Sequence, residues 1–144
     1  MRIAVASDHA GFELKEHVKQ LLAADGHEVV DVGPDTDEST DYPRYARPAA
    51  ELVASGDAER GVLVCGSGVG VSIVANKVTG VRAVNAHDAE EAQLAREHND
   101  VNVVTLSGSR IESAQADEIV RAFIAGKFEG GRHARRVGLI EDSP

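Results

Sequence analysis

Short apolar runs alternate with longer amphipathic segments along the whole chain. The positions of Leu14, Val18, Leu21 and Leu22, at i, i+4, i+7 and i+8, predict a helix. Short apolar runs predict strands, and the run 62–64, which is apolar without alternation, suits a parallel strand covered on both faces. Strands are predicted at 3–6, 28–32, 61–65, 81–84 and 102–106. Helices are predicted at 12–24, near 45–54, from a glycine-rich turn at 66–70 to about Lys77, at 89–98 and at 113–125.

The regular alternation of strand and helix predicts an α/β fold. Right-handed crossovers make such strands parallel and put helices on both faces of the sheet, which gives a three-layer αβα sandwich with a five-stranded parallel sheet. No linker, repeat or low-complexity segment divides the chain. We therefore expect a single domain over residues 1–144, ending in a basic segment from about residue 130.

Charge and cysteine content narrow the classes of function. Fifteen Lys and Arg stand against twenty-four Asp and Glu, a net charge of −9, which disfavours binding to nucleic acid or to an anionic membrane. The single cysteine excludes an internal disulfide and a multi-cysteine metal site, and no H-E-x-x-H pattern occurs, so we expect no metal.

The termini and the apolar stretches predict a cytoplasmic protein. The chain enters a strand directly after Met1, without the apolar region of a signal peptide. The longest uncharged stretch, 61–76, has about 16 residues, fewer than the roughly 20 that a membrane-spanning helix needs.

Ligands of open parallel sheets bind beyond the carboxyl ends of the strands, and the turn from Cys65 to Gly70 follows the third strand. Its glycines let the backbone approach a ligand, and free N–H groups at the start of the following helix would bind an anion or a developing oxyanion. A helix N-terminus at that point would raise the thiolate fraction of Cys65. The alternative is a small buried cysteine beside a tight turn.

Three other constellations each allow two interpretations. Asp8 and His9 could hold a hydroxyl or a phosphate, or Asp8 could cap the first helix. His98 could be a general acid or base, or could simply stand favourably at a helix C-terminus. Arg132 and Arg136, four residues apart, could bind phosphate, or could belong to a solvated tail.

Six segments of the chain form a recognisable combination: Ser7–Phe12, Thr40–Pro43, Cys65–Gly70, Ala75–Lys77, Arg96–Asp100 and Gly130–His133. Together they resemble the ribose-5-phosphate isomerase type B family, which includes galactose-6-phosphate isomerase subunits. The resemblance runs from Ile3 to about Val137. It implies a flavodoxin/Rossmann-like αβα sandwich and a cofactor-free aldose–ketose isomerase that interconverts ribose 5-phosphate and ribulose 5-phosphate through a cis-enediolate. It also implies a homodimer, or a dimer of dimers, with the site shared between subunits.

The resemblance also implies roles for individual residues. Cys65 resembles the base that moves a proton between C2 and C1, assisted by the hydroxyl of Ser67, and His98 with Asp8 resembles the pair that opens the sugar ring. Backbone N–H groups of the turn would hold the enediolate oxygen; these belong to Gly66, Gly68, Val69 and Gly70. The other implied substrate contacts are Tyr42 at the sugar pocket, Asn99 at the hydroxyls, and His9, Arg110, Arg132 and Arg136 at the phosphate.

The segment before Arg110 departs from the family pattern, because 103–110 carries one extra residue that could shift this arginine. Ribose 5-phosphate is the default substrate, and a four- or six-carbon sugar phosphate is the alternative. A non-catalytic phosphate-binding module would need the turn and the arginines but not Cys65 with His98. A thiol redox sensor ranks lower, since no second cysteine could resolve it.

Overall fold

The computed structural model describes residues 1–141, which form five strands and six helices. The strands are β1 (Arg2–Ser7), β2 (Glu28–Gly33), β3 (Arg60–Cys65), β4 (Ala83–Asn85) and β5 (Val103–Ser107). The helices are α1 (Phe12–Ala24), α2 (Pro43–Ser55), α3 (Val69–Asn76), α4 (Ala89–Asn99), α5 (Ser113–Ala125) and α6 (Arg132–Glu141). The prediction of one domain over 1–144 includes residues 142–144, which lie outside the described residues.

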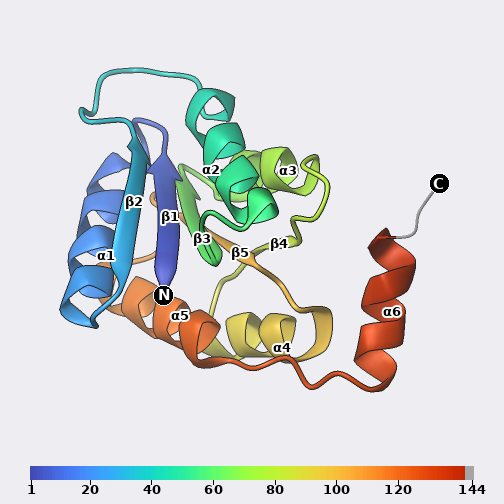
Figure 1. Ribbon diagram of the computed structural model, residues 1–144. Coiled ribbons are helices and arrows are strands. Elements are labelled where there is room, and N and C mark those ends of the chain that lie inside the picture. The colour runs from blue at the N-terminus through green and yellow to red at the C-terminus, as the bar shows by residue number, and fades with distance from the viewer. Residues whose placement is uncertain (142–144) are drawn as a thin grey trace.

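The strands form one sheet in which every pair is parallel, in the order β2-β1-β3-β5-β4 (Figure 1). The predicted αβα sandwich is confirmed. The first three positions follow the flavodoxin order 2-1-3-4-5, and the last two strands are exchanged. As a result β5 lies beside β3 in the middle of the sheet, and the carboxyl ends of β1, β3 and β5 are neighbours.

Two apolar clusters fill the space between the sheet and its helices. One cluster packs α1, α4 and α5 against the face that includes Val62 and Val64. The other packs α2 and α3 against the face that includes Leu63 and Cys65. Because successive side chains of a strand point to opposite faces, Cys65 at the end of β3 lies on the α2–α3 side.

Most predicted boundaries lie within one residue of the structure, and two differ from it by two residues. The strand predicted at 81–84 is β4 at 83–85, because the N–H of Arg82 donates to Oδ1 of Asn102 (2.8 Å) and not to a neighbouring strand. Helix α2 begins at Pro43, two residues before the prediction; proline suits a first helical position, where the N–H has no partner within the helix.

The basic C-terminal segment folds into α6, which stands apart from the sheet (Figure 1). Its buried residues are His133, which stacks on His98 of α4, and Val137, and Glu141 pairs with Arg82. Leu139 and Ile140 nevertheless remain 69% and 54% exposed. Within residues 1–141, every helix is too short or too polar to cross a membrane.

Candidate functional site

The thiol of Cys65 lies at the carboxyl end of β3, directly before the glycine turn. Cys65 is 3% exposed, and its Sγ accepts a hydrogen bond from the N–H of Gly68 (3.2 Å). Cys65 is thus both the small buried cysteine that the sequence allowed and a sulfur atom with a donor aimed at it.

The turn carries its glycines where a side chain would not fit. Gly68 has φ of +77°, and a Cβ on it would lie 2.3 Å from Oδ1 of Asn85. A Cβ on Gly70 would lie 2.7 Å from the ring of Tyr42, so this ring packs directly against the turn. Gly70 and Val71 stand in the first turn of α3, where N–H groups have no partner within the helix. The turn can therefore present backbone donors to an anion beside Tyr42.

Asp8 and His9 follow β1 at the same edge of the sheet. Oδ1 of the buried Asp8 accepts a hydrogen bond from the N–H of Gly11 (2.9 Å), which is itself the N-cap residue of α1, so Asp8 closes the turn before the helix and does not occupy the cap position. His9 is exposed, and its Nδ1 lies 3.1 Å from both backbone N and O of Thr40. When the N–H of Thr40 donates to Nδ1, the neutral ring carries its proton on Nε2, which then can donate to a ligand.

The segment after β5 joins the same edge. The N–H groups of Gly108 and Ser109 donate to the carbonyls of Cys65 (2.9 Å) and Gly66 (3.1 Å). These bonds bring the exposed Arg110 to the rim beside the turn. The carboxyl edge therefore collects most of the predicted residues: Asp8, His9, Tyr42, Cys65, Gly66, Ser67, Gly68, Val69, Gly70 and Arg110.

The remaining predicted residues lie elsewhere. His98 and Asn99 end α4, which runs from the carboxyl end of β4 back to the amino end of β5. With 11 residues, α4 carries them about 16 Å from that edge. Arg132 and Arg136 are exposed on α6. One chain therefore holds the predicted site in two parts, at opposite ends of the sheet.

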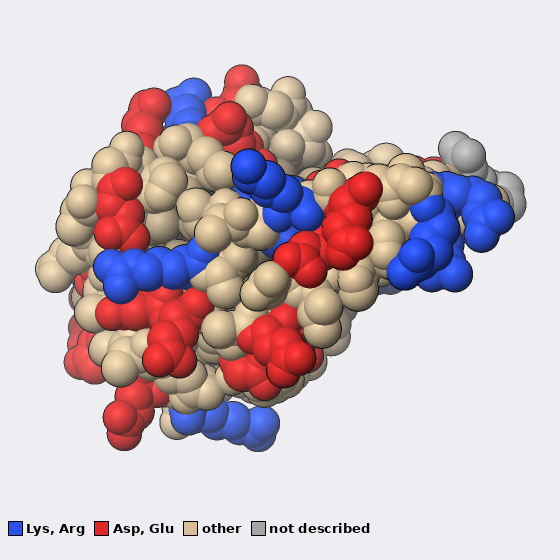
Figure 2. All heavy atoms as spheres, turned by 90° about the horizontal axis from the view of Figure 1, so that it is seen from below, with Lys and Arg blue, Asp and Glu red and all other residues tan. Residues whose placement is uncertain are grey.

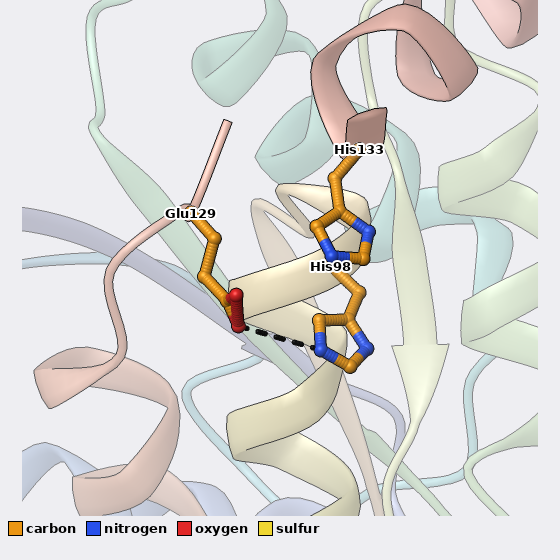
Figure 3. A group of neighbouring side chains, drawn as sticks. All are labelled: His98, Glu129 and His133. Carbon is orange, nitrogen blue, oxygen red and sulfur yellow. Dashed lines mark ion pairs between the residues drawn. The ribbon is translucent and has the colours of Figure 1, made fainter. Parts of the chain in front are cut away.

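His98 is surrounded by side chains from the C-terminal part of the chain (Figure 3). Its ring stacks on His133 with centroids 4.4 Å apart and planes 6° from parallel, and its Nε2 lies 3.4 Å from a carboxylate oxygen of Glu129. Burial lowers the pKa of His133, and the neighbouring charges of His98 and Arg132 lower it further. His133 is therefore neutral at a pH where an exposed histidine is still partly charged.

The same three residues form a group with metal-ligand atoms close together. One ligand atom from each of His98, Glu129 and His133 lies within 4.8 Å of the others. An ion shared by two imidazoles lies in both ring planes, whereas these rings are stacked nearly parallel, so binding would require a ring to turn. The absence of a metal stays a prediction.

Charge is distributed unevenly over the surface. Figure 2 shows Lys and Arg side chains together on the projecting C-terminal end, whereas on the body Lys and Arg are interspersed with many Asp and Glu. Arg132, Arg135 and Arg136 are the exposed arginines of α6. This helix carries positive charge in a chain whose net charge is −9.

Two neighbours of the site were missed in the sequence. Asn85 ends β4 beside Gly68, and the rule about carboxyl ends of strands could have indicated it. Glu129 lies 31 positions from His98 and carries no motif, so only the fold reveals this neighbour.

The chain is similar over nearly its whole length to proteins of one kind. The family model described as Ribose/Galactose Isomerase matches residues 3–140. Ribose-5-phosphate isomerase B of Escherichia coli (strain K12) is 46% identical over 140 residues, covering 96% of this chain and 93% of the relative. The structure of ribose-5-phosphate isomerase B from Clostridium thermocellum matches with a TM-score of 0.97 at 42% identity, covering 99% and 96% of the two chains. That of Mycoplasma genitalium, with bound ribulose-5-phosphate, matches with a TM-score of 0.93 at 41% identity, covering 97% and 93%.

Proposed function

Because the chain belongs to the ribose/galactose isomerase family, we propose that it is an aldose–ketose isomerase that interconverts ribose 5-phosphate and ribulose 5-phosphate. The observation that carries this proposal is the sulfur atom of Cys65, which accepts the N–H of Gly68 at the mouth of a turn lined with backbone donors. The relative from Mycoplasma genitalium, with ribulose-5-phosphate bound, supports the five-carbon substrate.

In this proposal Cys65 is the base. Its thiolate takes the proton from C2 of the open-chain aldose, which leaves a cis-enediolate, and the thiol then returns a proton to C1. The hydroxyl of Ser67, which accepts the N–H of Val69 (3.1 Å), assists the proton movement between the two oxygen atoms. Backbone donors of the turn stabilise the enediolate oxygen, where negative charge develops in the transition state.

The other predicted residues bind the substrate and open its ring. His98 and Asp8 move the ring-opening proton. Oδ1 of Asp8 accepts a hydrogen bond from Gly11, which leaves Oδ2 available to a sugar hydroxyl. Tyr42 and Asn99 contact the sugar. His9, Arg110, Arg132 and Arg136 hold the phosphate, whose binding energy keeps the reacting carbons beside Cys65.

These roles require two copies of the chain. Cys65 and His98 act on neighbouring atoms of one sugar, but α4 separates their ends of the molecule by about 16 Å. A second copy can supply His98 and the arginines of α6 to the Cys65 of the first. Exposed apolar side chains support such an interface: Val69 and Ile73 on α3, Leu94 on α4, and Leu139 and Ile140 on α6. We propose a homodimer or a dimer of dimers.

No cofactor has a role in this proton-transfer chemistry. A base that depends on a free thiol suits a reducing compartment, so we propose a cytoplasmic enzyme. Nucleic acid and membranes are not proposed as partners, because the net charge of −9 disfavours both.

Alkylation of the thiol tests the role assigned to Cys65. We expect iodoacetamide to label Cys65 faster than free cysteine at pH 7, and ribose 5-phosphate to protect it. The chain contains a single cysteine, so the incorporated mass reports on this residue alone. If Cys65 is labelled slowly, and ribose 5-phosphate does not change the rate, Cys65 is not the base. That result would favour a phosphate-binding module.

A further inference from the structure

Three polar side chains of β4 and β5 each donate a hydrogen bond to a carbonyl group of the glycine turn. They act on three consecutive carbonyls, so the orientation of the whole turn is fixed from one side. The pairs are Ser107 Oγ with Gly66 O (2.6 Å), Asn85 Nδ2 with Ser67 O (3.2 Å) and Thr105 Oγ1 with Gly68 O (2.8 Å).

Each of these bonds also orients an N–H group. In a planar trans peptide the C=O and the following N–H point in opposite directions, so holding one fixes the other. Asn85 holds the carbonyl of Ser67, and the N–H at the other side of that peptide belongs to Gly68. This N–H is the donor to Sγ of Cys65 (3.2 Å). Asn85 therefore sets the direction of the donor that stabilises the thiolate.

Thr105 acts on the next peptide in the same way. It holds the carbonyl of Gly68, and the N–H of that peptide belongs to Val69, which donates to the hydroxyl of Ser67 (3.1 Å). With its lone pair engaged by Val69, the hydroxyl of Ser67 is limited in how it can point its proton.

Burial shows that packing alone does not account for these side chains. Thr105 is 0% exposed in a strand whose neighbours Val104 and Leu106 are apolar. Valine would fill the same space without the desolvation of a hydroxyl group. Asn85 has a buried Oδ1 that finds no hydrogen-bond partner among the described residues, so its side chain is not satisfied as a purely structural amide would be.

We propose that Asn85 and Thr105 are positioning residues of the isomerase: Asn85 aims the N–H of Gly68 at the thiolate of Cys65, and Thr105 orients Ser67. The inference rests on the proposed function for its catalytic consequence. Its effect on the sulfur atom depends only on the hydrogen bonds of the turn.

Asn85→Ala tests the first half. We expect the pH midpoint for iodoacetamide labelling of Cys65 to rise, since the thiolate loses an aligned donor. We also expect kcat to fall about tenfold, with KM within about twofold, because the donor matters most when the base is charged. The same measurements are made on Asn85→Leu, whose side chain is closer in size to asparagine than alanine is. This second variant tests the proposal if Asn85→Ala does not fold.

Asn76→Ala is the matched control. Asn76 also clamps backbone, exchanging two hydrogen bonds with Ala83 (3.0 and 2.8 Å) at the amino end of β4, away from the turn. We expect it to lower stability and leave the labelling midpoint of Cys65 unchanged. An unchanged midpoint in both Asn85 variants, or an equal shift in Asn76→Ala, would overturn the assignment of Asn85.

Thr105→Val and Thr105→Ser test the second half. Valine keeps the shape and removes the hydroxyl, whereas serine keeps the hydroxyl and removes a methyl group. We expect kcat to fall in Thr105→Val and to recover in Thr105→Ser, although serine is the more cavity-forming change. If kcat instead follows the melting temperature of the two variants, Thr105 has only a structural role. A wild-type protein without isomerase activity would refute the proposed function, while the labelling midpoints would still decide the role of Asn85.

Discussion

Two inactive variants are expected to restore each other's activity when their chains are mixed. Cys65→Ala removes the proposed base, and His98→Ala removes the proposed ring-opening residue. General acid and base groups act within about 3 Å of their proton, and α4, about 16 Å long, places His98 at the end of the sheet opposite Cys65 within one chain. The pair can serve one substrate only if each comes from a different copy.

The size of the effect follows from two-fold symmetry. In a mixed dimer, one site combines the Ala substitutions of both chains, and the other combines intact Cys65 of one chain with intact His98 of its partner. Equal mixing with free exchange gives about half mixed dimers, so the pool recovers about a quarter of wild-type activity. A purified mixed dimer carrying two different affinity tags recovers about half.

The assay is the initial rate of ribulose 5-phosphate formation after the subunits have exchanged. Cys65→Ala mixed with the double variant Cys65→Ala/His98→Ala is the control, because no dimer of these chains contains an intact site. Activity that stays at the level of this control, in mixed dimers shown to form, would refute the shared site. It would also require His98 to act within its own chain or not at all.

Two further predictions concern the turn and the histidine stack. Gly68→Ala should destabilise the protein and abolish activity, because its Cβ would lie 2.3 Å from Asn85 Oδ1. Gly26→Ala is the control, since Gly26 has a similar φ (+88° against +77°) and its Cβ would meet nothing within 4 Å. Equal losses of unfolding free energy in urea for the two variants would contradict the clash. The pKa of His133 is lowered by burial, so the unfolded chain binds a proton more readily than the folded one. The stability that neutral His133 contributes to the folded protein is complete above the unfolded pKa of about 6.5, and it is lost as the pH falls below that value. Unfolding free energies at pH 7.5 and 5.5 should therefore differ less in His133→Gln, and an unchanged difference would exclude this residue as the cause.

Apolar periodicity was enough to predict the order of the five strands and of helices α1 to α5, since each of these elements is visible locally, but it did not predict α6 in the basic C-terminal segment. The grouping of Asp8 and Cys65 at one edge also followed, because it depends only on strands being parallel, whereas Tyr42 was expected at the sugar pocket only from the family resemblance. The sequence did not predict that β5 lies between β3 and β4, because the order of strands depends on which faces pack best across the whole sheet. A local pattern likewise could not predict that the N–H of Arg82 bonds to the side chain of Asn102, so that β4 begins only at Ala83.

The second half of the site depends on contacts between distant segments. His98 was identified by its motif, but its stacking on His133 joins positions 35 residues apart through the packing of α6 on α4. The roles of Asn85 and Thr105 depend on the direction of single peptide groups in the turn, which the sequence does not encode as a pattern.

The initial rate of isomerisation over a panel of four-, five- and six-carbon aldose phosphates, with Cys65→Ala beside the wild type, tests the central claim most directly. The account predicts that ribose 5-phosphate dominates the panel and that the variant loses at least about 10²-fold in kcat, as removal of a general base does. A preference for another sugar phosphate would keep the mechanism and change the substrate. Absence of turnover on every member, in folded protein freed of phosphate, would contradict the isomerase itself.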